Sequence, residues 1–338
     1  MRTRSTRRQP KRAALRRLLA MLRQSGVVKE SLPPASTPAQ HWVKEFARHL
    51  REDCGFATTT TGTYCLAAKR LLARLYGGGP VMFRTLNAAR VLKFVGHHAQ
   101  HFGRSSSQSA TTGLRSFFRF LLRRGKITLD LAASVPSVAG WTLARLPQHL
   151  PAGAVHRVLA DQPRVSAAGK RDFAILLLLA RLGSRSCEVA ALRLEDIDWE
   201  TGSLNVRSHK AGRAVALPLP AGFGRAIAVY LKTGRPGRLQ CKCREVFVRN
   251  RAPLVALSRM AIACVARAAL RRTGISGVIM GAHTFRHTLA SDLLRRGASL
   301  DQIGRILRHK DASTTAIYAK VDMGALRPLA MRWPGGGV

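Results

Sequence analysis

A single stretch, residues 283–318, limits what this chain can be more than any other feature. It reads HTFRHTLASDLLRRGASLDQIGRILRHKDASTTAIY. His283, Arg286 and His287 are spaced i, i+3 and i+4, so a helix would project all three side chains from one face. The spacing therefore predicts a helix that carries a cluster of hydrogen-bond donors.

A second helix is expected within the same stretch. Ser299 and Gln302 have the spacing of a capping box, in which each residue satisfies a backbone N–H at the start of a helix. The expected apolar stripe of this helix consists of Ile303, Ile306 and Leu307.

Two more polar side chains follow this second helix. His309 comes just after it, and Tyr318 stands nine residues later in a short segment begun by Asp311 or Ser313. Histidines, an arginine and a tyrosine suit a phosphate diester better than a metal. They combine a fixed cation, neutral hydrogen-bonding imidazoles and a nucleophilic oxygen, and no carboxylates gather among them.

These residues resemble the tyrosine recombinase, or phage integrase, family. The family pattern is His-x-x-Arg, then Leu-Gly-His, then a tyrosine. Here it reads His283-Thr-Phe-Arg286, Leu307-Arg308-His309 and Tyr318. The resemblance extends upstream to RDFAILLLLARLGSRSCEVAALRLEDIDW, where the family has its first arginine box, and to SHKAGRAVALPLP, where it has a lysine hairpin. It covers roughly residues 40 to 322.

The resemblance implies a set of site residues. The catalytic set is Arg185, Lys210, His283, Arg286, His309 and the nucleophile Tyr318, with Glu188 and His287 in support. Arg185 stands in Gly183-Ser184-Arg185, where the family has Gly-Leu-Arg. Three simpler interpretations stay open: Arg185 and Glu188 as a surface ion pair, Lys210 as a solvated hairpin lysine, and His287 as a structural residue.

The implied chemistry is strand cleavage by a covalent phosphotyrosine. Tyr318 attacks the phosphodiester, the arginines neutralise its oxygens, and Lys210 protonates the departing 5′ oxygen. His283 is expected to accept the proton of the tyrosine, and His309 to donate a hydrogen bond to the phosphate. The intermediate preserves the energy of the broken bond, so no metal or other cofactor is expected.

Arg308 departs from the family pattern, which has glycine before the second histidine. If this position needs a positive φ, an arginine there costs about 1–2 kcal/mol. A displaced end of the preceding helix is the alternative.

The expected fold is mainly α. It has a helical core-binding (SAM-like) domain at its N-terminal side, followed by a mixed α/β catalytic domain with a small antiparallel hairpin or sheet. The expected divisions are a basic N-terminal extension and linker (1–38), the core-binding domain (39–131), a linker (132–150) and the catalytic domain (151–338). Helices are expected over 61–75, 86–95, 109–124, 171–182 and 257–272, with another after Pro151, and strands over 203–207 and 214–217.

The formal net charge of +40 indicates a polyanionic partner, and nucleic acid is the first candidate. The resemblance implies that this partner is double-stranded DNA. A coding bias toward arginine would explain part of the excess, but not the scarcity of acidic residues. Arg115, Arg119 and Arg123 recur along one expected helix, either as phosphate contacts or as a solvated face. Residues 1–24 are either a basic arm on DNA or a disordered tail.

The longest apolar run, residues 173–180, is too short to span a membrane, and no signal peptide is evident. The protein is therefore expected in the cytoplasm, associated with the nucleoid, and its six cysteines are expected to be buried or free thiols rather than disulfides. The expected role is integration and excision of a mobile element. The alternatives are resolution of chromosome or plasmid dimers, a type IB topoisomerase, and an inactive DNA-binding relative. The resemblance also implies a homotetramer on two DNA sites, with sibling recombinases as further candidate partners, and a C-terminal tail that docks on a neighbouring subunit or packs on its own domain.

Overall fold

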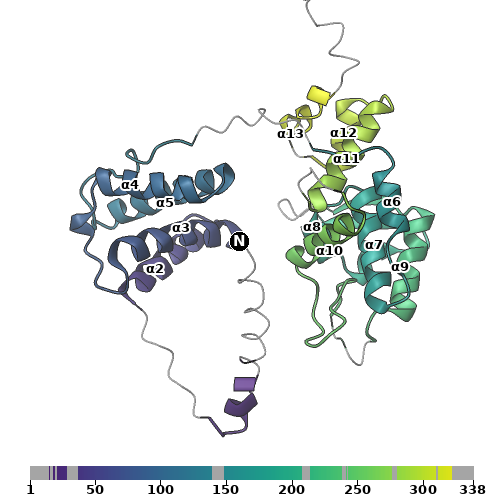
Figure 1. Cartoon of the computed structure of the whole chain (residues 1–338), viewed down its shortest axis with the longest axis horizontal. Helices are drawn as coiled ribbons and strands as arrows, with labels where there is room; N and C mark the ends of the chain where they lie inside the picture. The colour runs from purple at the N-terminus through teal and green to yellow at the C-terminus, as the bar shows by residue number, and fades with distance from the viewer. Residues whose placement is uncertain are drawn as a thin grey trace, which may run out of the picture. The chain divides into compact units, whose positions relative to one another are not determined.

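The computed structural model describes residues 15, 18–19, 21–28, 37–138, 148–207, 214–237, 241, 243–275, 280–309 and 311–321. The chain forms two compact units, Met1–Trp141 and Thr142–Val338 (Figure 1). The division between them falls inside the segment 132–150 that was predicted as the linker.

The N-terminal unit is a bundle of helices around one apolar core. Its elements are α2 (Pro38–Glu52), α3 (Thr58–Tyr76), the short 3-10 helix η1 (Phe83–Thr85), α4 (Ala88–His101) and α5 (Arg104–Arg123). Helix α3 packs against both α2 and α5, and α4 packs against α5. The predicted apolar stripe of α5 is confirmed in large part, since Leu114, Phe117, Phe118 and Leu121 are all buried. A Cβ on Gly113 would lie 3.0 Å from the Cα of Tyr64, so a glycine here lets α3 and α5 approach closely.

Local capping decides where these helices begin. Thr37 and Gln40 form a capping box at α2, and the Asn87 side chain accepts a hydrogen bond from the backbone N–H of Arg90 at α4. The helix predicted over 86–95 therefore starts two residues later, and it continues to His101.

The second unit carries the remaining elements in chain order. They are α6 (Ala154–Ala160), α7 (Ala167–Arg181), α8 (Ser186–Ala191), η2 (Leu194–Asp196), β1 (Ile197–Asp198), β2 (Ser203–Arg207), β3 (Ala214–Pro218), α9 (Ala221–Thr233), α10 (Arg259–Arg272), α11 (Ala282–Arg295), α12 (Leu300–Leu307), α13 (Ser313–Ala316) and η3 (Ala319–Val321). Figure 1 shows α7 in the middle of this unit, where it packs against α6, α8, α9, α10 and α11. Its apolar run from Ala174 to Ala180 is buried throughout, which confirms the prediction of a central helix.

A small antiparallel sheet lies beside these helices, with the strand order β1-β2-β3. The predicted strands β2 and β3 pair with Leu204 opposite Leu217 and Val206 opposite Val215. The buried carboxylate of Asp196 accepts a hydrogen bond from Arg207 Nε at 3.0 Å, which ties β2 to the turn before β1. The expected fold, mainly α with a small antiparallel sheet in the catalytic unit, is thus confirmed.

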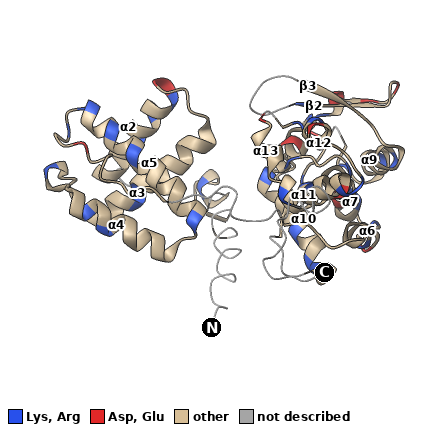
Figure 2. Ribbon diagram, turned by 90° about the horizontal axis from the view of Figure 1, so that it is seen from above, with Lys and Arg blue, Asp and Glu red and all other residues tan. Residues whose placement is uncertain are grey.

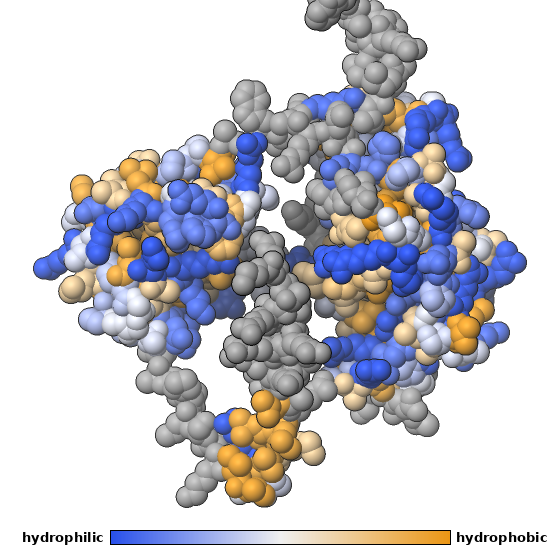
Figure 3. Space-filling model, viewed as in Figure 1, coloured by the Kyte–Doolittle hydropathy of each residue, from blue (hydrophilic) through white to orange (hydrophobic). Residues whose placement is uncertain are grey.

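Lysine and arginine residues are spread over the helices of both units, and acidic residues are few (Figure 2). An exception to the polar surface is the stretch near the N-terminus, where Figure 3 shows hydrophobic side chains gathered together and where Leu15, Leu18 and Met21 are exposed. Most of the predicted basic arm, residues 1–24, lies outside the described residues, as does the segment after Val321. Of the helices described, none is long and apolar enough to cross a membrane.

Candidate active site

Helix α11 supplies the central cation of the site. Arg286 is buried, with 4% of its surface exposed. Its Nη1 donates to the carbonyl oxygen of Gly183 at 2.6 Å, and its Nη2 donates to the carbonyl oxygen of Leu307. Gly183 lies just after the end of α7, and Leu307 is the last residue of α12. The guanidinium of Arg286 therefore joins α11 to the ends of these two helices. Burial, together with the charge of Arg185, lowers the pKa of Arg286 to about 10, and the side chain stays cationic at neutral pH.

Gly183 allows this close approach. It has a φ of +55°, a backbone conformation that glycine adopts without a steric penalty. A Cβ added there would lie 2.7 Å from Leu307 Cδ2 and 3.0 Å from Leu289 Cδ2. The turn at the end of α7 can therefore pass beside α11 and α12 only without a side chain.

Arg185 and Glu188 form a closed pair at the start of α8. The Glu188 carboxylate accepts the backbone N–H of Arg185 at 2.9 Å and its Nη1 at 2.8 Å. The Glu188 side chain is only 3% exposed, whereas that of Arg185 is 32% exposed. This is not the surface ion pair of the simpler interpretation. The carboxylate is a buried anchor, and the guanidinium keeps an open side.

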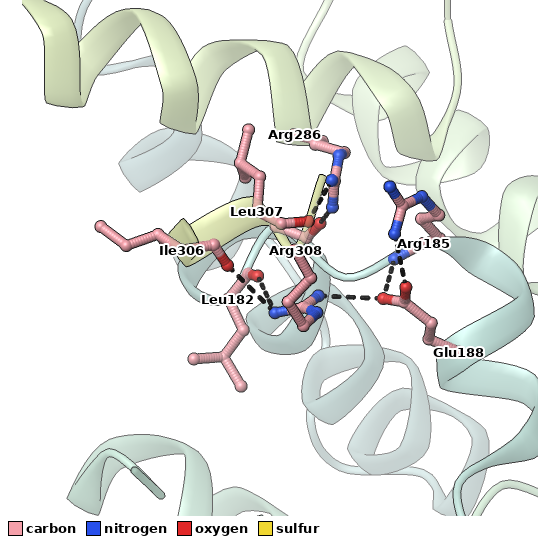
Figure 4. Close-up of polar contacts among 8 residues, drawn as sticks. Leu182, Arg185, Glu188, Arg286, Ile306, Leu307 and Arg308 are labelled. Atoms are coloured by element: carbon pink, nitrogen blue, oxygen red, sulfur yellow. Dashed lines mark hydrogen bonds and ion pairs between the residues drawn. The ribbon is translucent and has the colours of Figure 1, made fainter. Parts of the chain in front are cut away.

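Arg308 ends α12 in the left-handed conformation, with φ 57° and ψ 47°. Of the two alternatives from the sequence, positive φ rather than a displaced helix end is therefore the one observed. Its side chain turns inward, and its Nη2 donates to Glu188 Oε2 at 2.9 Å (Figure 4). Burial alone would raise the pKa of the Glu188 carboxyl, but the Arg185 amide and the charge of Arg308 hold that pKa below its ordinary value.

His309 follows directly and lies against the short helix α13. Its Nδ1 is 2.6 Å from the hydroxyl of Thr315. A Cβ added to Gly304 would lie 3.1 Å from the same Thr315 oxygen. The capping box of Ser299 and Gln302 that starts α12 is confirmed. Burial, and then the charge of Arg286, lower the pKa of His309 to about 4, so the imidazole is neutral at physiological pH.

The hydroxyl of Tyr318 lies inside the site, with 1% of the residue exposed. It is 2.9 Å from Nδ1 of His287, which projects from α11. Burial raises the pKa of Tyr318 to about 12, although the charges of Arg286 and Arg185 act in the opposite direction. The phenol therefore holds its proton at neutral pH in this conformation. Burial also lowers the pKa of His287, so its ring is neutral and able to accept a proton.

In this conformation the hydroxyl contacts His287, which lies one helical turn along α11 from His283, the residue expected to receive the proton of the tyrosine. His283 is exposed to solvent. Its pKa is nevertheless lowered, first by partial desolvation of the ring and then by the charges of Arg286 and Arg185.

The structure thus brings together Arg185, Glu188, His283, Arg286, His287, His309 and Tyr318 in the second unit. Lys210 lies outside the described residues. Arg119 and Arg123 are exposed on α5 of the N-terminal unit, while Arg115 donates to the carbonyl oxygen of Val135 and to Ser137 Oγ. The side chains of Arg308 and Thr315 were not predicted as part of the site. The glycine missing before His309 was the only signal for Arg308.

The arrangement favours reaction at a phosphate over metal chemistry. Two arginines and three imidazoles surround a phenol, and the pKa of each imidazole is lowered. Arginines bind phosphate oxygens through charge-assisted hydrogen bonds. In the part of the chain that the structure describes, no group of three or more His, Cys, Asp or Glu side chains is placed to hold a metal ion.

Comparison with known proteins places both units. The model of the phage integrase family matches residues 151–324, and that of the phage integrase N-terminal SAM-like domain matches residues 43–125. A putative integrase/recombinase of Sinorhizobium fredii, y4rA, is 43% identical over 327 residues, which are 96% of this chain and 78% of the relative. Tyrosine recombinase XerD of Ralstonia nicotianae is 27% identical over 299 residues, which are 88% of this chain and 94% of the relative.

Solved structures support the same fold. The site-specific recombinase XerH bound to its palindromic difH substrate matches with a TM-score of 0.66 at 16% identity, over 90% of this chain and 99% of that one. The chain belongs to the phage integrase family and is a tyrosine recombinase, an enzyme that breaks and rejoins DNA strands.

Proposed function

We propose that this protein is an integrase that inserts and excises a mobile DNA element through a covalent 3′-phosphotyrosine on Tyr318. The observation that carries the proposal is the buried phenol of Tyr318, 2.9 Å from a neutral His287 and within the field of Arg286 and Arg185. A nucleophile, a proton acceptor and two phosphate-binding cations are what transfer of a phosphodiester to a side chain requires.

The first step exchanges one phosphoester bond for another. The phenolic oxygen of Tyr318 attacks the scissile phosphorus and passes its proton to His287, while the bond from phosphorus to the 5′ oxygen breaks. Lys210 gives a proton to that departing oxygen. A 5′ hydroxyl from the partner strand then attacks the phosphotyrosine, releases Tyr318 and reseals the strand by the reverse sequence.

Arg185 and Arg286 are the cations that neutralise the nonbridging oxygens during this exchange. Arg185 is suited to do so because its guanidinium is partly open to solvent while its other face is held by Glu188. His283 and His309 are proposed as neutral donors to the same phosphate. Their lowered pKa values favour that form at physiological pH.

The resting site is not yet reactive. With a pKa of about 12, only about one Tyr318 side chain in 10⁵ is ionised at pH 7. Because Tyr318 is buried, the segment from α13 to η3 has to move for its oxygen to reach a phosphate. We propose that bound DNA drives this movement and that transfer of the proton to His287 accompanies the attack.

Duplex DNA is the proposed substrate. Support comes from the net charge of +40 and from the DNA-bound state of the XerH structure. Arg119 and Arg123 on α5 are proposed phosphate contacts. Four copies assembled on two duplexes are proposed as the active form, and ultracentrifugation with duplex sites tests that number.

Integration and excision are preferred to dimer resolution because the relative with 43% identity is named integrase/recombinase, whereas XerD matches at 27%. Deep sequencing of cells that express the protein beside its native flanking DNA separates the two roles. Excised circles with a rejoined donor site support the proposal. Conversion of plasmid multimers to monomers, with no excision, would assign dimer resolution instead.

The nucleophile is tested with a nicked duplex, in which cleavage releases the short fragment that bears the new 5′ hydroxyl, so that religation fails and the covalent adduct accumulates. Tyr318→Phe should bind this duplex normally and form no adduct, because the change removes only the hydroxyl. Tyr76→Phe is the matched control. That hydroxyl donates to the carbonyl oxygen of Met82 in the N-terminal unit, and its loss should leave adduct formation intact.

The role of Lys210 is tested with a substrate that carries sulfur at the bridging 5′ position. The 5′ alkoxide is a strong base and needs a proton, whereas a thiolate leaves without one. Lys210→Ala should therefore recover most of its cleavage rate on the sulfur substrate, and Arg185→Ala should not. Equal rescue of both variants, or of neither, would make Lys210 only a further phosphate contact.

A further inference from the structure

We propose that Arg308 is a positioning residue, which acts through Glu188 to hold Arg185 in the orientation that binds the scissile phosphate. The inference rests on the proposed function, and it concerns a position at which this chain departs from the family pattern. It accounts for a buried arginine where glycine would fit the backbone better.

The backbone conformation at Arg308 is a costly one for a residue with a side chain. Among the described residues other than glycine, Arg308 alone has a positive φ, at 57°. A residue with a Cβ adopts this conformation at an energetic cost, and glycine adopts it without one. Contacts of the guanidinium must therefore compensate for the backbone.

Those contacts centre on Glu188. The two side chains are 7% and 3% exposed, and Arg308 Nη2 lies 2.9 Å from Glu188 Oε2. Charge-assisted hydrogen bonds in such surroundings are strong, and a buried carboxylate that lacks partners is costly. The Nε of Arg308 is also buried and has no partner within the described part of the chain, so its position is set by the two ends of the guanidinium.

The carboxylate of Glu188 is divided between the two arginines. Its Oε1 accepts Arg185 Nη1 at 2.8 Å, while its Oε2 accepts the Arg185 backbone N–H and Arg308 Nη2, each at 2.9 Å. Arg308 thus occupies the side of the carboxylate on which Arg185 would otherwise form a second side-chain bond. The remaining donors of Arg185 stay free for phosphate.

The charge of the group follows the same logic. Arg185 and Arg308 each contribute +1 and Glu188 contributes −1, so the three carry +1 in total. Without Arg308 the total would be zero, and the carboxylate would cancel the charge of Arg185. Arg308 therefore preserves the positive potential that an anionic transition state requires.

Arg308 also binds backbone at both sides of the site. Its Nη1 lies 3.2 Å from the carbonyl oxygen of Ile306 and 3.5 Å from that of Leu182. Arg286 donates to the next carbonyl in each of these segments, so the two arginines join the ends of α7 and α12 in parallel (Figure 4). Helix C-termini expose unpaired carbonyls and carry partial negative charge, which favours cations there. Arg308 thus links the segment that bears His309 to the turn that bears Arg185.

The test is a cycle of three variants, Arg308→Gly, Glu188→Gln and the double substitution, measured as single-turnover adduct formation at saturating DNA. Glycine accepts the left-handed backbone, so Arg308→Gly should fold and bind DNA with unchanged affinity. We expect its cleavage rate to fall by about 10- to 100-fold, the effect of losing one charge-assisted hydrogen bond in the transition state. The double variant should be no slower than Glu188→Gln alone.

Arg305→Ala is the matched control. It also removes a cation from α12, but the side chain of Arg305 is 81% exposed. It should cleave at the wild-type rate. A wild-type rate for Arg308→Gly, or a double variant whose defect equals the product of the two single defects, would overturn the proposal. Adduct formation by the wild type in the same reactions tests the proposed function separately.

A second substrate distinguishes positioning from simple support of the fold. A methylphosphonate at the scissile position lacks the negative charge that Arg185 is proposed to neutralise. The rate difference between the wild type and Arg308→Gly should shrink on this substrate. An equal difference on both substrates would assign Arg308 a structural role only and would contradict the proposal.

Discussion

Replacing Gly183 by alanine should disrupt the packing of α7 against α11 and α12 and displace the hydrogen bonds of Arg286. Gly183 has a φ of +55°, and its carbonyl oxygen accepts a hydrogen bond from Arg286. A Cβ would lie 2.7 Å from Leu307 Cδ2 and 3.0 Å from Leu289 Cδ2. Leu307 is completely buried, so its methyl group has no free space into which to turn. Accommodation requires that α12 move away from α7, and the contacts of Arg286 would move with it.

Two costs add up in this variant. The left-handed backbone costs about 1–2 kcal/mol for a residue with a Cβ. Overpacking a buried methyl contact costs about 1–3 kcal/mol more. We therefore expect Gly183→Ala to lower the free energy of unfolding of the second unit by about 2–5 kcal/mol and to reduce strand cleavage as well.

Gly202→Ala is the control that separates these costs. Gly202 belongs to the same unit and has a φ of +61°, but nothing lies within 4 Å of its added Cβ. Hydrogen exchange of the α7 and α11 amides across a urea series reports the stability of the second unit by itself. Gly183→Ala should lose more stability than Gly202→Ala by the overpacking cost. Equal losses would refute the close packing of α7, α11 and α12 described here.

Two further predictions concern salt and pH. Each neutralised phosphate contributes about −0.9 to the slope of log K for DNA binding against log salt concentration. If both units bind DNA, fluorescence anisotropy should give a slope steeper than about −4. A shallower slope would count against phosphate contacts from both units. The pKa of His309 is about 4 in the folded chain, against an ordinary value near 6.5. Between pH 6.5 and pH 4 the unfolded chain therefore binds a proton at His309 that the folded chain does not. As a result, the folded chain loses stability as the pH falls through this range. His309→Asn should lose less stability than the wild type between pH 7 and pH 4.5, by at most about 3 kcal/mol in urea unfolding, and an identical acid loss in both would show that His309 is not the group that titrates.

Local sequence patterns predicted much of this molecule because they act over short distances. The buried run of α7, the capping box of Ser299 and the pairing of β2 with β3 each depend on neighbouring residues, and each is confirmed. The same patterns are less informative about which face of a helix is covered. Ile306 was expected in the apolar stripe of α12, but it is 40% exposed, and Ile303 and Leu307 form the buried face.

Contacts between distant segments could not be read from the sequence. The bond between Arg308 and Glu188 joins residues that are 120 positions apart. The choice between His283 and His287 as the partner of Tyr318 depends on the path of the chain after α12, because both histidines project from α11. Spacing placed both on one helix, and tertiary packing selected one of them.

Identifying the protein atom that holds the DNA tests directly whether Tyr318 is the nucleophile. The wild type is trapped on the nicked duplex, digested, and analysed by mass spectrometry to find the peptide that carries nucleotide. We predict a single adduct, on Tyr318, with the phosphate attached to the 3′ end of the cleaved strand. An adduct on Tyr64, Tyr76 or Tyr230, or one through a 5′ phosphate, would rule out a 3′-phosphotyrosine on Tyr318.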